Sequence, residues 1–328
     1  MKNALRFFGF CLLLAPLPSI AGKNTERLIL FPRLHVGQVI RYQIGYRAAT
    51  NTDTESTVAA PMAPVGGQTN ANIILEVEVE DLRNDAGGPV ARLRTRIVNP
   101  DAISTNNTPR ANSTPQPNRA PSAVQPNKTV DFTLHADGRV TDVQGLDTLS
   151  SDERAAWQEW ISRFGGAAAL PQRGVKLGEK WKSDEPISNS LLSGLSWEKK
   201  SEYVNDAPCA AMQLTPQGDP AETQQPPETC AVILTTAILK QKSSPKDATP
   251  EDYKLHDLRN MGTAKGQNQI ISYFSLTTGL VVSATEDANQ SMNLTVATEN
   301  GSNRVHYSID AESHARVLLL ADSPASPR

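Results

Sequence analysis

Polar and apolar side chains alternate with a period of two along much of this chain, and this alternation constrains the fold more than any other feature of the sequence. The clearest stretch is ILEVEVEDLRNDAGGPVARLRTRIV, residues 74–98. Successive side chains of a β-strand point to opposite faces, so the pattern predicts strands with one buried face. Strand patterns do not alternate with helix patterns along the sequence, so we expect an antiparallel sheet.

The same stretch predicts a hairpin whose exposed face carries opposite charges. With the turn centred on Ala86, three pairs face each other: Glu80 with Arg92, Glu78 with Arg94 and Glu76 with Arg96. A row of arginines could bind an anion, but the three carboxylates neutralise this one. We therefore interpret it as a salt-bridge ladder that helps to set the register.

One amphipathic helix is predicted over about residues 151–165. Ser150 and Glu153 match a capping box, and Gly165-Gly166 supplies the end. The apolar stripe has helical spacing and consists of Trp157, Trp160, Ile161 and Phe164. Trp157, Trp160 and Phe164 could border an apolar cavity, although such a stripe more often packs directly against a sheet.

Together these patterns predict a mainly β fold, either a large curved antiparallel sheet or a half-barrel meander. Asp137-Gly138 indicates a second hairpin, and residues 266–311 read as a C-terminal meander of four strands. Residues 50–70, 101–128 and 322–328 are rich in Pro, Thr, Asn, Ser and Ala, so we expect two long disordered insertions and a disordered tail.

The N-terminus has the order of a secretory signal peptide. Lys2 and Arg6 precede an apolar run, and Ser19-Ile20-Ala21 follows, so we expect cleavage after about Ala21. Cys11 lacks the context of a lipid-attachment cysteine. The mature chain, a single β-rich domain over 22–321 without a transmembrane segment, is then expected in the periplasm or outside a bacterial cell.

Charge and cysteine content limit the classes of binding partner and the cellular compartment that we expect for the protein. Residues 1–21 hold two of the 32 Lys and Arg and no acid, so 30 cations face 35 acids in the mature chain. This negative balance disfavours nucleic acid. Cys209 and Cys230 remain after processing, and an even pair in an oxidising compartment predicts a disulfide. Two free thiols or half of a metal site are the alternatives.

Motifs of catalysis are missing from the sequence. The five histidines show no metal-binding spacing, and no Gly-x-Ser-x-Gly elbow, phosphate loop, dinucleotide fingerprint or calcium loop occurs. No catalytic, cofactor-binding or metal-binding residue is therefore assigned, and no cofactor is expected. Two carboxylates that meet in a cleft, as in glycosidases, leave no motif in the sequence.

A short internal similarity links two parts of the chain. LHVGQVI over 34–40 resembles VKLGEKW over 175–181, and each run enters a predicted strand. A single large sheet is the favoured interpretation, and a duplication of two halves is the alternative.

Turn and packing residues spread over most of the mature chain carry a family resemblance. They are Pro32, Gly37-Gln38, Tyr42, the DGRV run, Leu170-Pro171, LGEKW and the FSLTTGLVVS run of 274–283. In these the chain resembles a group of exported bacterial proteins of unknown function. The resemblance implies a curved antiparallel sheet with a helix near its concave side, loosely similar to periplasmic lipoprotein carriers. It implies no catalytic residue, and this chain departs from it by its long 101–128 insertion and its lack of a lipobox.

The sequence supports three functional hypotheses. The first is a non-catalytic envelope or secreted module that binds an apolar ligand, such as a lipid, or a partner protein through the sheet. The second is a secreted hydrolase that uses acidic residues. The third is a structural or adhesive surface protein.

Overall fold

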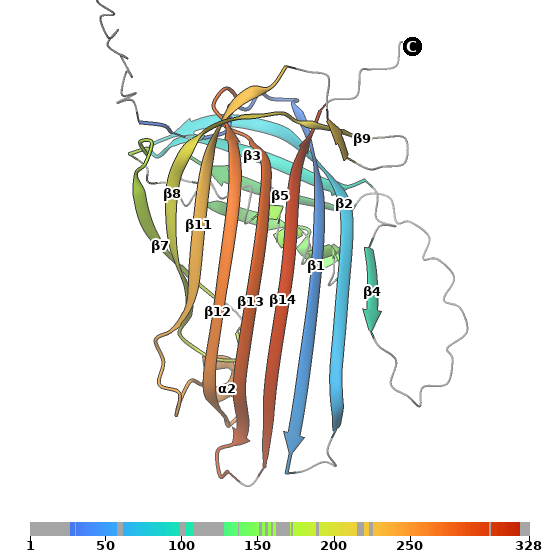
Figure 1. Cartoon of the computed structure of the whole chain (residues 1–328). Coiled ribbons are helices and arrows are strands. Elements are labelled where there is room, and N and C mark those ends of the chain that lie inside the picture. The colour runs from blue at the N-terminus through green and yellow to red at the C-terminus, as the bar shows by residue number, and fades with distance from the viewer. Residues whose placement is uncertain are drawn as a thin grey trace, which may run out of the picture.

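The computed structural model describes most of the chain (Figure 1). The described residues are 27–29, 31–57, 62–98, 103–107, 128–136, 138–150, 153–154, 157–158, 160–161, 171, 173–187, 190–214, 220–222, 226–301 and 303–321. The predicted signal peptide over 1–21 and the predicted tail over 322–328 lie outside these residues.

Strands make up most of the described chain, as the alternating pattern predicts. In chain order they are β1 (Val39–Ser56), β2 (Met62–Asp85), β3 (Gly88–Ile97), β4 (Ile103–Asn107), β5 (Thr129–His135), β6 (Val140–Gln144), β7 (Lys180–Pro186), β8 (Leu195–Cys209), β9 (Met212–Leu214), β10 (Pro220–Glu222), β11 (Glu228–Gln241), β12 (Leu258–Ser275), β13 (Val281–Thr298) and β14 (Arg304–Leu320). The short helical elements η2 (Leu146–Thr148) and α2 (Glu251–Lys254) join them. Residues 153–154, 157–158 and 160–161 are also helical, within the amphipathic helix predicted over 151–165.

The strands form one open sheet in the order β6-β5-β3-β2-β1-β14-β13-β12-β11-β8-β7. All neighbours along this order are antiparallel. Strands β6 and β7 are its two ends, and the pairing of β1 with β14 joins the N-terminal and C-terminal strands. The predicted mainly β fold with a large curved antiparallel sheet is confirmed.

The sheet has two faces of different character. One face, here the core face, carries the buried residues of the long strands, such as Tyr42, Ile44 and Val317. The green helical segment lies on this side, behind the long strands in Figure 1. The other face, here the opposite face, carries exposed residues such as Arg47 and His314. Burial of the apolar face supplies the main driving force for this layered arrangement.

A second, smaller hydrophobic cluster lies on the core face, under the loops that precede β8 and β12. It consists of Leu192, Leu195, Leu239, Ala248, Ala264 and Leu294. Asn260, fully buried in β12, holds the covering loops in place: its Nδ2 donates to the Leu191 carbonyl at 2.6 Å, and its backbone N–H donates to Thr249 Oγ1 at 3.0 Å.

The prediction of a disordered insertion over 50–70 is wrong for most of its length. Residues 50–56 continue β1 and residues 62–70 belong to β2, with Thr52 opposite Val65. Threonine has a high strand propensity, and two paired backbones satisfy their own hydrogen bonds even where the side chains are only half buried. Residues 58–61 lie outside the described part of the chain.

The predicted insertion over 101–128 also contributes to the sheet. Residues 103–107 form β4, which pairs with Gly67–Ala71 of β2. An unpaired strand edge offers free N–H and C=O groups, which explains why a segment of unpromising composition pairs there. Residues 101–102 and 108–127 lie outside the described residues.

The predicted hairpins are confirmed with two corrections to register and number. Glu76 and Glu78 lie opposite Arg96 and Arg94, but a bulge between Val79 and Asp81 moves Arg92 opposite Asp81 rather than Glu80. The C-terminal meander contains three strands, because the predicted strands 280–286 and 292–299 are parts of the continuous strand β13. The hairpin of β5 and β6 has Gly138 at a φ of 77°, and Asp137 lies outside the described residues.

Candidate functional site

The helical segment begins with the predicted capping box. The backbone N–H of Ser150 donates to Glu153 Oε2 at 2.8 Å, and the N–H of Glu153 donates to Ser150 Oγ at 3.3 Å. Lys128 Nζ also donates to Glu153 Oε2 at 2.8 Å. Burial raises the pKa of Glu153, but these hydrogen bonds outweigh burial, so the net shift of the pKa is downward.

The capping box places Trp157 and Trp160 against the core face of the sheet. Both are buried, and the ring of Phe132 from β5 lies edge-on to them at centroid distances of 5.7 and 6.0 Å. Tyr42 packs against Trp160 at 6.1 Å, and burial raises the pKa of its phenol. The described surroundings of the two tryptophans are therefore packed side chains.

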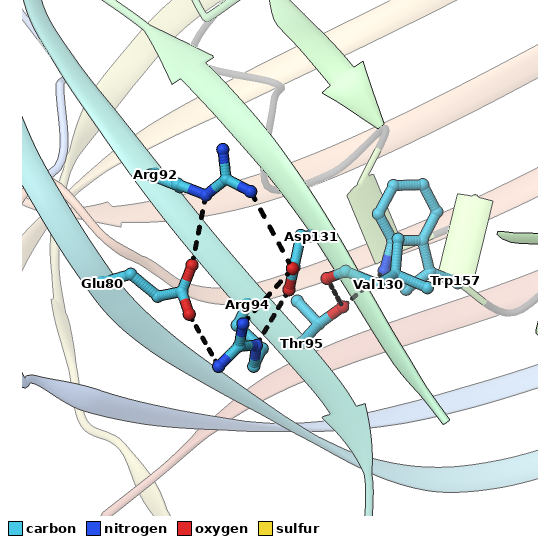
Figure 2. Close-up of polar contacts among 7 residues, drawn as sticks. All are labelled: Glu80, Arg92, Arg94, Thr95, Val130, Asp131 and Trp157. Carbon is cyan, nitrogen blue, oxygen red and sulfur yellow. Dashed lines mark hydrogen bonds and ion pairs between the residues drawn. The ribbon is translucent and has the colours of Figure 1, made fainter. Parts of the chain in front are cut away.

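A hydrogen-bond chain fixes the position of Trp157. Its Nε1 donates to Thr95 Oγ1 at 2.8 Å, and Thr95 Oγ1 donates to the Val130 carbonyl at 3.0 Å (Figure 2). Phe164 lies outside the described residues, and the grooves described below are lined by other residues. An apolar cavity bordered by Trp157, Trp160 and Phe164 thus stays a prediction.

The arginine row of β3 is neutralised by carboxylates. In Figure 2, Glu80 lies between Arg92 at 3.3 Å and Arg94 at 2.7 Å, and Asp131 of β5 accepts from Arg94 Nε at 2.9 Å. The hydrogen bond with Asp131 raises the pKa of Arg94. No cation of this cluster is left without an anion, which supports the salt-bridge interpretation over an anion site.

Glu76 extends the same network to β1. It accepts from Arg41 Nε at 2.9 Å and also pairs with Arg96. Burial raises the pKa of Glu76, but the hydrogen bonds and charges of Arg41 and Arg96 lower it further than burial raises it.

Cys209 and Cys230 form the predicted disulfide, with their Cα atoms 5.8 Å apart. Cys209 ends β8 and Cys230 lies in the neighbouring strand β11. The bond therefore fastens the ends of two adjacent strands.

The largest described hollow lies on the opposite face of the sheet, away from the tryptophans. It has a volume of about 700 Å³ and crosses six neighbouring strands, from β8 to β1. Two cross-strand rows form its surface. The first row is Lys200, Thr236, Gln269, Asp287, His314 and Arg47. The second row is Glu198, Ile238, Gln267, Asn289, Glu312 and Ala49.

We call this hollow the trough. A second hollow of about 530 Å³ continues it along the strands and shares Ile238, Gln267, Asn289 and Glu312 with it. Amide side chains lie mainly in the middle, charges of both signs lie along the rows, and no Phe, Tyr or Trp lines either hollow. Such a surface can offer many hydrogen bonds but lacks the large aromatic side chains that commonly stack against sugars.

The trough contains one carboxylate and histidine pair. His314 Nδ1 lies 2.6 Å from Asp287 Oδ1, and both side chains are more than half exposed, at 54% and 77%. No hydroxyl or thiol of the described residues forms a hydrogen bond with His314, and Ser313, the residue before it in β14, belongs to the core face. Among the described residues, the pair is therefore not hydrogen-bonded to a side chain that could act as a nucleophile.

A third hollow adjoins the trough at the β7 edge of the sheet. It has a volume of about 430 Å³ and shares Lys200 and Thr236 with the trough. We call it the lysine groove; side chains of the opposite face line it in pairs from three strands, Lys180 and Lys182, Lys200 and Glu202, and Leu234 and Thr236.

Sequence reasoning missed both surfaces. Polar residues at every second position of a strand resemble an ordinary solvated face, and their gathering becomes visible only when the register of six strands is known. The signal that could have indicated the lysine groove is the presence of lysines at 182 and 200, in two consecutive strands.

The described residues contain neither a cluster of metal ligands nor a membrane-spanning helix. No group of three or more His, Cys, Asp and Glu side chains in the described ranges converges as metal ligands. No helix that the structure describes has the length and apolar character needed to cross a bilayer.

Comparisons with known proteins give little further guidance. No protein-family model matches the chain, and no curated protein is significantly similar to it. Solved structures with some similarity include "a putative lipoprotein from Parabacteroides distasonis ATCC 8503", with 8% identity, a TM-score of 0.23, and coverage of 90% of this chain and 98% of that one. Another is a DUF1329 family protein from Desulfovibrio piger ATCC 29098, with 8% identity, a TM-score of 0.12, and coverage of 87% and 88%. At such TM-scores neither similarity carries an inference about this chain.

Proposed function

We propose that the mature chain is a non-catalytic exported protein that binds an extended segment of a partner protein in the trough. The observation that carries this proposal is the position and lining of the trough. It is the largest hollow among those described, it is open, and its surface consists of amides, hydroxyls and charges of both signs. A polypeptide offers backbone donors and acceptors along its whole length, which suits such a surface.

The described packing favours a protein partner over an apolar ligand. Trp157, Trp160 and Phe132 are buried and pack against one another between the helical segment and the sheet. The trough, in contrast, would leave an acyl chain in contact with charged and amide groups that lose hydration without gaining a partner.

Export rests on two independent features. The predicted signal peptide ends at about Ala21. The disulfide of Cys209 and Cys230 is typical of proteins that fold in an oxidising compartment.

Site-specific photo-crosslinking tests the proposal. A benzophenone amino acid is placed at Gln269 or Asn289, both exposed in the trough, in cells that express the chain with its leader. Leu255 and Thr277, exposed in turns away from the trough, are the control positions. We expect the same cross-linked protein from both trough positions and none from the controls.

A binding measurement with the purified partner completes the test. Gln267→Arg introduces a bulky charge into the trough and should weaken binding at least tenfold, whereas Thr263→Arg, on an exposed position of the same strand outside both hollows, should have little effect. The absence of an adduct at both trough positions would contradict the proposal. So would co-purified lipid, detected by mass spectrometry, together with full binding by the Gln267→Arg variant.

A further inference from the structure

The six outward-facing residues of the lysine groove form a compact two-by-three patch. Lys182 of β7 lies directly opposite Lys200 of β8, and Lys200 lies opposite Thr236 of β11. In the next row, Lys180 lies opposite Glu202, and Glu202 lies opposite Leu234. The two rows are two residues apart along each strand, a spacing of about 6.8 Å.

The lysines of this region differ in whether they have an anion. Lys180 pairs with Glu202 at 3.1 Å, Lys199 pairs with Glu185, and Lys242 lies 3.7 Å from Asp184. Lys182 and Lys200 form no ion pair with any described residue, although both line the groove. The unpaired cations are thus the two that face the groove and each other.

Two like charges directly opposite each other on a sheet are unfavourable. Their Cβ atoms lie about 5 Å apart in such a pair, and no described carboxylate lies within ion-pair distance of either ammonium group. An anion placed between the two ammonium groups would remove it. The pair is therefore a point where a bound carboxylate gains from two cations at once.

The neighbouring row supplies apolar contact rather than a further cation. Leu234 is half buried on the floor of the groove, and the methylene stems of the lysines add apolar surface around it. Glu202, already paired with Lys180, would repel a second carboxylate at this row.

We propose that the lysine groove binds an acidic residue of the partner segment at Lys182 and Lys200, and an apolar residue two positions away at Leu234. Side chains two apart in an extended peptide point to the same side about 6.8 Å apart, which equals the separation of the two rows along the strands. Leu234 lies in the second row on β11, the strand next to the one that carries Lys200, so the segment would lie obliquely over the groove. The recognised chemistry is a Glu-x-Leu pattern in the part of the partner segment that lies on the groove, beside the trough. This inference rests on the proposed function, since it names the chemistry of the same partner.

Short peptides test the inference without the natural partner. The probes are fluorescently labelled acetyl-Ser-Glu-Ser-Leu-Ser-amide and its counterparts with Gln in place of Glu, and with Glu in place of Leu. Anisotropy with the mature chain should show the tightest binding for the Glu-x-Leu peptide. It should also show binding that weakens as NaCl is raised from 50 to 500 mM, because salt screens the lysine charges.

Lysine variants assign the binding to the groove. Lys182→Gln and Lys200→Gln should each weaken the Glu-x-Leu peptide about threefold to fivefold, the range expected for one exposed ion pair. Lys240→Gln is the matched control, because Lys240 is exposed, carries no ion pair with a described residue and lies outside the groove. It removes the same charge and should leave the affinity unchanged.

Three outcomes would overturn the inference. They are equal binding of the Glu and Gln peptides, equal effects of Lys182→Gln and Lys240→Gln, and lysine-dependent binding of phosphatidylglycerol vesicles in place of the peptide. Its failure is distinguishable from that of the proposed function. If the cross-link at Gln269 survives in the Lys182→Gln/Lys200→Gln double variant but is lost in Gln267→Arg, whose position lies in the trough and outside the lysine groove, only the assignment of the acidic residue falls.

Discussion

Gly37 and Gly178 adopt the same left-handed conformation, with φ angles of 79° and 77°. The Gly37 N–H donates to the Val79 carbonyl at 2.8 Å, and the Gly178 N–H donates to the Tyr203 carbonyl at 2.7 Å. Each glycine is also followed by a polar side chain that accepts from a backbone N–H three residues earlier, Gln38 from His35 and Glu179 from Lys176, both at 3.0 Å. LHVGQVI and VKLGEKW are therefore similar in structure as well as in sequence, and both lead into strands of the same sheet.

Gly37→Ala and Gly178→Ala should destabilise the protein to a similar extent. No atom lies within 4 Å of a Cβ added at either position, so the cost is that of a left-handed alanine alone, about 1–2 kcal/mol. Urea unfolding of the two variants measures it. Costs that differ by more than about 1 kcal/mol would contradict the equivalence of the two turns.

Gly262→Ala provides a contrast to these two substitutions. A Cβ there would lie 2.1 Å from the Asn293 carbonyl oxygen, in the neighbouring strand β13. Strands β12 and β13 would have to separate locally, so the loss of stability should exceed that of Gly37→Ala in the same urea experiment. An equal or smaller loss would show that the sheet yields easily at this position.

Thr95→Val tests the hydrogen-bond chain beneath the helical segment. The valine has the same shape but leaves the Trp157 indole N–H without its acceptor in a buried site. We expect a loss of about 1–3 kcal/mol, which is the cost of one unsatisfied buried donor. Chemical denaturation followed by tryptophan fluorescence measures it, and Thr263→Val, on an exposed position, is the control. A loss no larger than that of the control would mean that another acceptor replaces Thr95.

Replacing Cys209 and Cys230 by serine should lower the free energy of unfolding by about 3 kcal/mol. The two residues are 21 positions apart, and opening a loop of this length restores that much chain entropy to the unfolded state. Equilibrium unfolding with and without dithiothreitol measures the difference. The reductant should destabilise the wild-type chain and leave the double variant unaffected; equal stability of both chains under oxidising conditions would count against the role of the bond.

Glu76 should make the folded state sensitive to acid. Its pKa in the folded state lies below the ordinary value of 4.5, so its ion pairs stabilise the fold above that pH and are lost as the pH falls through the lowered pKa. Glu76→Gln should therefore show a shallower decline of stability below pH 4.5. Unfolding free energies between pH 7 and pH 3 test this, with Glu78→Gln, an exposed residue of the same strand, as the control. If the stability of Glu76→Gln falls as steeply with decreasing pH as that of Glu78→Gln, Glu76 is not a source of the acid sensitivity.

The sequence predicts the sheet well where side-chain burial alternates and poorly where it does not. The alternation around Glu76 and Arg96 gives the correct pairing of β2 and β3, because the buried face fixes the register. Composition led to the wrong prediction of disorder for residues 50–70, because the strands there depend on backbone pairing rather than on a buried apolar face. The bulge near Glu80 has no sequence signature, because it reflects how a long strand twists.

The candidate site could not be predicted at all from local pattern. The capping box of Ser150 and Glu153 and the disulfide follow from short-range or pairwise rules, and both are present. The trough and the lysine groove instead arise from the order of strands, which brings Arg47 and Lys200 into one row although 153 positions separate them in the sequence.

The pairing of β1 with β14 has a consequence for biogenesis. Arg41 lies opposite Leu320, 279 positions later in the sequence, so the middle of the sheet cannot pair until that later segment has been synthesised. Pairing between such distant segments slows folding, and until it occurs the strand edge stays unpaired and prone to aggregation. The described sheet therefore stays incomplete in a nascent chain until β14 emerges, and an incompletely folded chain is also what a translocon threads.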